Sequence, residues 1–534
     1  MPRSLVLALS LLALTAGDAQ AAVAPAAADF EVVVVPGFTV ADLEEVQDEG
    51  AVGLLVPGAG PETSAELARA ALVRGEVRNS LRDGLPEGEP RVSFETGSLG
   101  SAPGPAIYVG LPDGGRQPND QRYPVLVVGR GYEGLLTSGS TRITGLVSVA
   151  DVAPTVLGEE DALGSEPADD PAAELRELDE RIDANNRARL AVELIACALV
   201  ALLALVLPAA AIPALAAVLL ANLALGIAGI SSFWLVLLVI AASAGVGGPL
   251  LARARLSPLT LGLVLTGTIA AYLVALGIDG AVVALSPLGP TQNGRFYGFS
   301  NLLETMLLLP SFAAAALLTA RLGWAAFGSV ALLAFVTVAG NRFGADGGGA
   351  IVLAVGFAVL GVLLADARRR AIVVALAGAV VLAFGLLAVD AATGSESHVT
   401  RALEGGPVEL AEDLGERVSL SVARATRDWY VALLLSALLL VLALLVARTV
   451  VRRGVSRETA VPLALAAALA ASLVVNDSPN DVLLVGLATY LAADRGMLPA
   501  RWPAGSPSPW LRSSPSSRSP AAAARRPSRP RPRP

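Results

Sequence analysis

The sequence lacks lysine altogether and contains a single cysteine, Cys197, and a single histidine, His398, among 534 residues. One cysteine excludes an intrachain disulfide and a cysteine-based metal site. One histidine excludes most zinc sites and catalytic designs with several histidines. Charged residues make up only 16% of the chain and hydrophobic residues 54%, with a mean hydropathy of +0.63. This composition excludes an ordinary soluble enzyme and is typical of an integral membrane protein.

The amino terminus has the pattern of a secretory signal peptide. Arg3 precedes the apolar run SLVLALSLLALTA, and the small residues of DAQA are suited to cleavage after Ala21. The apolar run is short for a membrane span. We therefore expect residues 1–21 to be a signal peptide and the mature chain to begin outside the cytoplasm.

Residues 22–157 are predicted to form an extracytoplasmic α/β domain. Short runs rich in β-branched residues predict buried strands, at 31–35, 52–57, 106–112 and 123–129. Helices are expected between them at 39–50 and 61–81, the second opened by Pro61 and Glu62. This alternation favours a mainly parallel sheet covered by helices. Residues 158–189 are predicted to be an acidic linker followed by a polar helix that runs towards the membrane.

Residues 190–494 are predicted to be an all-α polytopic membrane domain of about eleven helices. The spans are placed near 190–207, 209–227, 231–250, 257–277, 301–320, 323–339, 349–365, 371–389, 429–447, 459–475 and 481–494. Alternate loops hold most of the arginines of this domain, which is the positive-inside pattern. We therefore expect a multi-pass protein of the plasma membrane with a cytoplasmic carboxyl terminus. Residues 495–534, rich in Arg, Pro and Ser, are expected to be a disordered cytoplasmic tail.

Three polar stretches fall at predicted outer ends of spans, and none falls at a cytoplasmic end. They are 286–301, 340–349 and 476–481. An ionisable residue at membrane depth needs a partner or a function, so these stretches predict one outward-facing polar pocket. Its candidate substrate-binding residues are Arg295, Asn301, Glu304, Asn341, Arg342, Asp346, Asn476, Asp477 and Asp481.

Two interpretations of this pocket stay open. Arg295 and Arg342 could clamp a phosphate or carboxylate group, and the acids could hold a hard cation or act as a base. Alternatively, the groups pair with one another and only cap and lock the helix bundle. The spacing assigns no catalytic residue, no metal site and no cofactor, and nothing indicates nucleic acid as a partner.

The α/β domain resembles a truncated member of the alkaline phosphatase superfamily. The resemblance rests on GLVSVADVAPTVL, within residues 137–158, and on the opening segment VVVVPGF followed by GLLVPGAGPETS. Thr63 or Ser64 stands where such a domain has its nucleophile. However, Pro36 and Gly37 replace the metal-binding acid expected after the first strand. A hydroxyl without metal ions has no activation at neutral pH, so the resemblance implies a non-catalytic pseudoenzyme domain.

The complete arrangement resembles uncharacterised bacterial polytopic membrane proteins that join such a domain to many spans. It implies an envelope protein that binds or handles an anionic or lipid-linked envelope precursor at the outer face of the lipid bilayer. One alternative is a membrane-embedded transferase acting on a polyprenyl-linked substrate, with Arg417, Arg424 and Arg427 of the loop 390–428 near lipid phosphates. Another is a transporter, although few ionisable residues occur near mid-span and no inverted repeat is visible.

Overall fold

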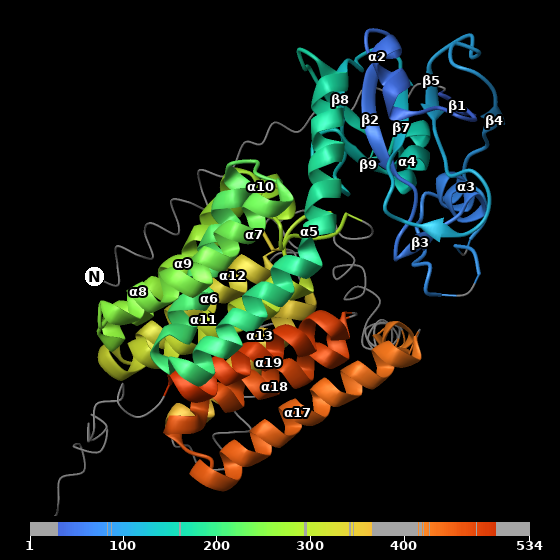
Figure 1. The fold of residues 1–534 in the computed structure, drawn as a ribbon. Coiled ribbons are helices and arrows are strands. Elements are labelled where there is room, and N and C mark those ends of the chain that lie inside the picture. Colours follow the sequence, from blue (N-terminus) through green and yellow to red (C-terminus); the bar gives the residue numbers. More distant parts are fainter. Residues whose placement is uncertain are drawn as a thin grey trace, which may run out of the picture.

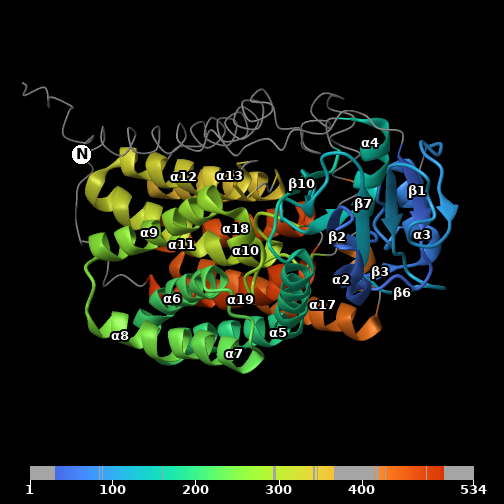
Figure 2. The ribbon, with the colours of Figure 1, turned by 90° about the horizontal axis from the view of Figure 1, so that it is seen from above.

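The protein consists of an α/β part at one end of a helical bundle (Figure 1). The computed structural model describes residues 30–82, 84–86, 88–159, 162–292, 296–340, 343–344, 347–365, 415, 419, 421–426, 428–476 and 478–497. The predicted signal peptide, the predicted span 371–389 and the predicted tail beyond residue 497 lie outside the described residues. Seen from above, the sheet and the bundle lie end to end (Figure 2).

The α/β part is built on an eight-stranded sheet in the order β10-β8-β2-β7-β5-β1-β4, with β9 also paired to β2. Its strands are β1 (Glu31–Val34), β2 (Ala51–Val56), β4 (Glu95–Thr96), β5 (Ala106–Val109), β7 (Tyr123–Val128), β8 (Gly134–Thr137), β9 (Leu146–Ser148) and β10 (Gly164–Glu166). A separate two-stranded sheet joins β3 (Glu62–Thr63) to β6 (Gln117–Pro118). Each of the four predicted strands corresponds to a strand of the large sheet.

The large sheet is mixed, so the prediction of a mainly parallel sheet was too simple. β1 is parallel to β4 and β5, and β2 is parallel to β8 and β9. The central strand β7, however, runs antiparallel to both β2 and β5. A parallel neighbour needs a crossover connection, usually through a helix. Residues 110–122, between β5 and β7, contain no helix and return the chain directly.

Helices cover both faces of this sheet. On one face, Leu55 and Val125 pack with α3 (Ala65–Arg74) and α4 (Val152–Leu157). On the other face, Leu54 packs with α5 (Pro171–Val206), and with Leu285 from the helical bundle. The remaining short helices are η1 (Val40–Asp42), α2 (Leu43–Val46) and η2 (Val149–Asp151). The core of the sheet is therefore continuous with one end of the bundle.

The helix predicted from Pro61 begins four residues later than expected. The Ser64 Oγ accepts a hydrogen bond from the Leu67 N–H at 3.2 Å and caps α3, while Glu62 and Thr63 form β3. A serine is a strong N-cap, and it satisfies one of the free donors of the first turn. The helix ends at Gly75, whose φ of 68° is the left-handed conformation typical of a C-terminal glycine.

The helix α5 connects the two parts of the molecule. Its 36 residues combine the predicted polar helix with the first predicted span in one continuous helix. At 1.5 Å per residue its length is about 54 Å. Pro171 occupies the first turn, and the Asp170 carboxylate accepts a hydrogen bond from the Ala173 N–H at 3.1 Å. The polar half packs on the sheet, and the apolar half enters the bundle.

The rest of the bundle is helical. It contains α6 (Pro208–Ile227), α7 (Phe233–Ala242), η3 (Ser243–Gly247), α8 (Gly248–Arg253), α9 (Pro258–Ile278), α10 (Gly280–Ala284), α11 (Asn301–Leu322), α12 (Trp324–Ala339), α13 (Gly347–Ala365), α17 (Trp429–Arg453), η4 (Arg457–Thr459), α18 (Ala460–Val475) and α19 (Pro479–Gly496). In the part of the chain that the structure describes, eight helices are long and apolar enough to cross a membrane, and α12 is a shorter apolar helix. These helices fit a multi-pass membrane protein.

The two ends of the bundle differ in charge. Because successive helices alternate in direction, α8, α11, α17 and α19 all finish at the end away from the sheet, with Arg253, Arg321, Arg453 and Arg495 in their last turns. The described residues of the loops that join α10 to α11, α12 to α13 and α18 to α19 lie at the end near the sheet, which is called the sheet-side end below (Figure 2).

Candidate functional site

Two of the predicted polar stretches pack directly against each other at the sheet-side end. The Phe299 N–H donates a hydrogen bond to the Gly344 carbonyl oxygen at 3.1 Å. Gly298 has a φ of 73°, and any Cβ there would collide with the same carbonyl oxygen. Only glycine satisfies both requirements without strain. The fold thus joins the stretch before α11 to the stretch after α12.

Glu304 brings in the third stretch. It lies in the first turn of α11, and its exposed fraction is 0%. Its Oε2 accepts a hydrogen bond from the Asn476 Nδ2 at 2.9 Å, and the same Asn476 amide also donates to the Ser472 Oγ at 2.9 Å. A fully buried carboxylate is costly unless it is hydrogen-bonded or paired. Asn476, at the end of α18, supplies such a bond.

Asp481 joins the same stretch to α5. The Asp481 Oδ2 lies 3.6 Å from the Arg189 Nη2, and Arg189 also donates to the carbonyl oxygen of Gly289. One turn further along α5, Glu193 is only 4% exposed and interacts electrostatically with both Asp481 and Arg189. Asn476 and Asp481 therefore connect this stretch to two buried acids, Glu304 on α11 and Glu193 on α5. Below, the polar cluster means Arg189, Glu193, Glu304, Asn476 and Asp481.

Arg189 and Glu193 are absent from the residues predicted from sequence. Asn185, Arg189 and Glu193 are spaced four residues apart, so they share one face of α5. The Asn185 Nδ2 donates to the Leu285 carbonyl oxygen at 2.8 Å, which fixes the loop before α11. This four-residue repeat of polar side chains continues into the first apolar span. This repeat is the sequence signal from which Arg189 and Glu193 could have been predicted.

The remaining predicted residues divide into two groups. Asn301 is half-buried at the start of α11, and its carbonyl oxygen accepts a hydrogen bond from the Thr305 hydroxyl at 2.7 Å. Arg424 donates from its Nη1 to the Ser478 Oγ at 3.0 Å, so the end of the loop 390–428 reaches the 476–481 stretch. The other predicted residues lie outside the described residues: Arg295, Asn341, Arg342, Asp346, Asp477, Arg417 and Arg427.

A buried hydrogen-bond network holds the loop between α10 and α11. The Asn222 Nδ2 donates to the Ser286 Oγ at 3.0 Å, and the Asn222 Oδ1 accepts from the Leu288 N–H at 2.9 Å. The Ser300 hydroxyl donates to the Leu288 carbonyl oxygen at 2.7 Å. Fully satisfied networks of this kind make a loop rigid. The backbone beside the polar cluster is therefore fixed by side chains of the bundle.

The α/β part is anchored to the same end by arginine contacts. Arg122, 5% exposed, forms ion pairs with Asp179 and Asp183 of α5. Burial alone would lower the pKa of Arg122, but the charges and hydrogen bonds of Asp179 and Asp183 outweigh it and raise the pKa above its ordinary value. The Arg142 guanidinium lies 4.0 Å from the ring centroid of Tyr297, a cation–π contact between the α/β part and the loop before α11.

A cleft of about 260 Å³ opens between the α/β part and the bundle. Its apolar wall includes Leu135, Leu178 and Leu285, while Arg142 and Asp279 provide charged groups. An apolar wall with a few polar groups is the usual construction of a binding site for a small molecule or for part of a larger one. The cleft lies at the junction of the two parts.

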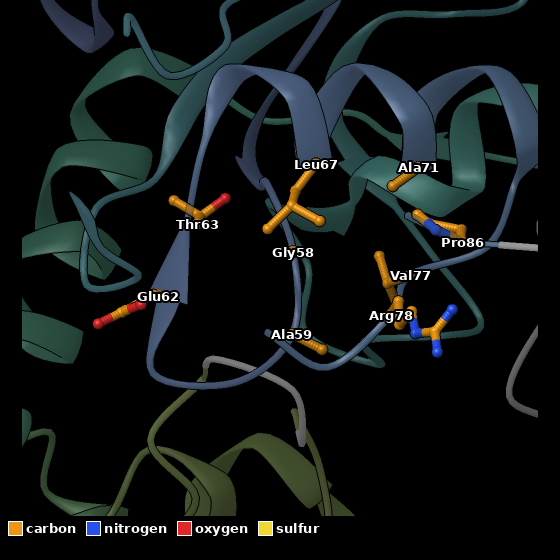
Figure 3. Close-up of a pocket in the computed structure, with 9 residues that line it drawn as sticks. All are labelled: Gly58, Ala59, Glu62, Thr63, Leu67, Ala71, Val77, Arg78 and Pro86. Carbon is orange, nitrogen blue, oxygen red and sulfur yellow. The ribbon is translucent and has the colours of Figure 1, made fainter. Parts of the chain in front are cut away.

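Thr63, which was predicted to stand at a nucleophile position, lines a small pocket of the α/β part (Figure 3). Thr63 is 2% exposed, and among the described residues its hydroxyl has no hydrogen-bond partner. Figure 3 shows the Arg78 guanidinium on the other side of this pocket, directed away from Thr63. Ser64 is occupied as the cap of α3. In the part of the chain that the structure describes, neither hydroxyl is hydrogen-bonded to a base that could activate it.

Metal-ligating groups do not gather in this α/β part as the structure describes it. No three side chains of the His, Cys, Asp and Glu types come together within the described residues. After β1, Pro36 and Gly37 form a turn in which Gly37 has a φ of 72°. The position at which the resemblance expects a metal-binding acid is therefore a tight turn.

Comparison of the chain with protein-family models, with curated proteins and with solved structures found no match.

Proposed function

We propose that this chain is a plasma-membrane protein that binds the anionic group of a lipid-linked envelope precursor at its polar cluster, on the extracytoplasmic side. Eight apolar helices support insertion in a bilayer. The arginines in the last turns of α8, α11, α17 and α19 support a cytoplasmic location for the opposite end. The α/β part then lies outside the cell.

The observation that carries the proposal is the buried hydrogen bond between Glu304 and Asn476. Around it, polar stretches from distant parts of the chain come together at one end of an otherwise apolar bundle. Such groups at membrane depth usually mark a substrate site. Because they lie at the sheet-side end rather than through the bundle, they favour binding at one face over a path across the membrane.

The arginines of the site indicate the charge of the ligand. Arg189 and Arg424 lie at the sheet-side end, and the same polar stretches contain Arg295 and Arg342 in the sequence. Guanidinium groups offer planar paired donors that match a phosphate or carboxylate. Acids such as Asp481 position these cations, so a lipid-linked phosphate is the ligand that best combines the charge with the membrane location.

In this proposal the α/β part is a non-catalytic cover. It is a degenerate relative of the alkaline phosphatase superfamily, and its Arg122 contacts hold it on α5. The cleft lined by Arg142 and Leu285 would admit the polar head of the precursor beside the polar cluster. A transferase acting on a polyprenyl-linked substrate is the second candidate. It is favoured by the complete burial of Glu304, which suits a catalytic base.

The test is mass spectrometry of lipids that co-purify with the protein. Wild-type protein should carry a polyprenyl phosphate or a polyprenyl-linked precursor. Glu304→Gln should remain folded but carry much less of it, because Gln keeps the shape of the side chain but loses the charge-assisted bond to Asn476 that joins two polar stretches. The matched control is Glu458→Gln, an exposed acid of η4 at the opposite end. Equal amounts of bulk phospholipid and no polyprenyl lipid in all three proteins would contradict the proposal.

A further inference from the structure

Glu193 is a buried carboxyl group of the polar cluster, and the lipid proposal gives it no role of its own. It is 4% exposed on α5. The charged groups that face it are Asp481, from α19, and Arg189, one turn away on α5. Burial in an apolar bundle disfavours the ionised form of a carboxyl group, and a second carboxylate nearby disfavours it further.

Among the described residues, Arg189 is the only cation that acts on Glu193. Of the elements packed on α5 inside the bundle, α6 and α7 contain no ionisable residue, and the nearest further group on α5 is the buried Cys197. The helix α11, which packs on α19, carries the buried acid Glu304 instead. Arg189 is shared between the Asp481 carboxylate and the Gly289 carbonyl oxygen. One guanidinium therefore serves two carboxyl groups.

We propose that Glu193 and Asp481 together hold one exchangeable proton, which makes this pair a proton-binding site at the sheet-side end of the bundle. With the proton bound to Glu193, the three side chains Glu193, Asp481 and Arg189 sum to zero charge, and Asp481 keeps its ion pair. On release, the proton passes to water and leaves one net negative charge. All three side chains belong to the polar cluster, but proton binding here does not require a bound lipid.

The geometry also provides the route for exchange. The Asp481 side chain is 24% exposed, whereas Glu193 is 4% exposed, so Asp481 gives the pair its larger contact with water. Asp481 and Asn476 lie five positions apart in one short stretch, and Asn476 is bonded to Glu304. We therefore expect protonation of Glu193 to affect the position of Glu304 through Asp481 and Asn476.

Dicyclohexylcarbodiimide tests the site, because this reagent modifies protonated carboxyl groups in apolar surroundings. Purified full-length protein is treated in acidic, neutral and alkaline buffer, and the adducts are located by peptide mass spectrometry. We expect modification of Glu193 at neutral pH that declines in alkaline buffer. Glu174, exposed on the same helix, is the internal control and should stay unmodified.

The variant Asp481→Asn tests whether Glu193 shares its proton with Asp481 or is protonated only because it is buried. Removing the neighbouring negative charge leaves Arg189 to stabilise ionised Glu193, so the pH of half-modification should fall by about one unit. Infrared spectroscopy supplies a second readout, since wild-type protein at neutral pH should show a protonated carboxyl band that is missing in Glu193→Gln. Absence of both the adduct and this band would overturn the proposal. If the adduct has the same pH dependence in Asp481→Asn as in the wild-type protein, the proposal that Glu193 and Asp481 share a proton is wrong.

Discussion

The Asn476 Nδ2 lies 2.9 Å from the Glu304 Oε2, although 172 positions separate the two residues in the chain. The bond joins the end of α18 to the first turn of α11, and both residues are buried. Because the acceptor is a carboxylate, the bond belongs to the stronger, charge-assisted class. It fixes two polar stretches relative to each other at the sheet-side end.

A double-mutant cycle measures this bond. With Glu304→Gln, Asn476→Ala and the combined variant, we expect a coupling free energy of about 1–2 kcal/mol in thermal or denaturant unfolding in detergent. Glu458→Gln combined with Asn476→Ala is the control and should be additive, because Glu458 is exposed at the opposite end of the bundle. Additive effects of the Glu304 and Asn476 variants would show that the two side chains do not interact.

Arg122 holds the α/β part on α5, and its removal should loosen that attachment. Breaking a fully buried ion pair costs about 3–5 kcal/mol. Here Asp179 and Asp183 are 28% and 40% exposed and can reach water, so we expect about 2 kcal/mol for Arg122→Ala. In this variant, limited proteolysis should cleave the chain between the two parts faster than in the wild-type protein, because the attachment is weaker. Arg116→Ala is the matched control, since Arg116 is 62% exposed and 3.8 Å from Glu62. Equal effects of the two variants would contradict the anchoring role.

Gly298 tests the contact between the loops before α11 and after α12. Alanine there meets two obstacles: a left-handed φ of 73° and the Gly344 carbonyl oxygen. Gly323 is the matched control, because it has a φ of 83° and open space around it. The conformational strain alone costs about 1–2 kcal/mol, so Gly298→Ala should destabilise the protein more than Gly323→Ala does. Equal melting temperatures would mean that the two loops do not pack closely.

The α/β part should be inactive as a phosphoesterase. Thr63 is buried, Ser64 caps α3, and a turn at Pro36 and Gly37 replaces the expected acid. Incubation of the full-length protein with a model phosphoester and zinc, magnesium or manganese should give no turnover above background. Metal-dependent turnover that disappears in Thr63→Ala would show that the resemblance extends to catalysis.

The strands and helices were largely predictable because burial leaves a clear pattern in the sequence. Runs such as 31–35 and 123–129 are short, β-branched and buried on both faces, and they match β1 and β7 within a residue. The direction of β7 was not predictable, because it depends on whether residues 110–122 form a crossover helix. The start of α3 was predicted wrongly because Pro61 and Ser64 are both start signals, and only the capping hydrogen bond decides between them.

For the candidate site, the sequence predicted some of the residues but not the contacts between them. Polar side chains at the outer ends of apolar spans identify Glu304 and Asn476, but no local pattern shows that they form a hydrogen bond. Arg189 was assigned to the linker and Glu193 to an apolar span, so neither was selected. Their role depends on the packing of α5 against α19, which the sequence periodicity of α5 alone does not show.

The side of the membrane on which the polar cluster lies is the most direct test of the account. In a Cys197→Ala background, a cysteine at Asn480, exposed beside Asp481, is compared with one at Arg452, exposed at the opposite end of α17. In intact cells, an impermeant maleimide should label Asn480→Cys fully and Arg452→Cys only after the membrane is opened. Labelling of Arg452→Cys in intact cells, with Asn480→Cys protected, would place the polar cluster in the cytoplasm and contradict an extracytoplasmic binding site.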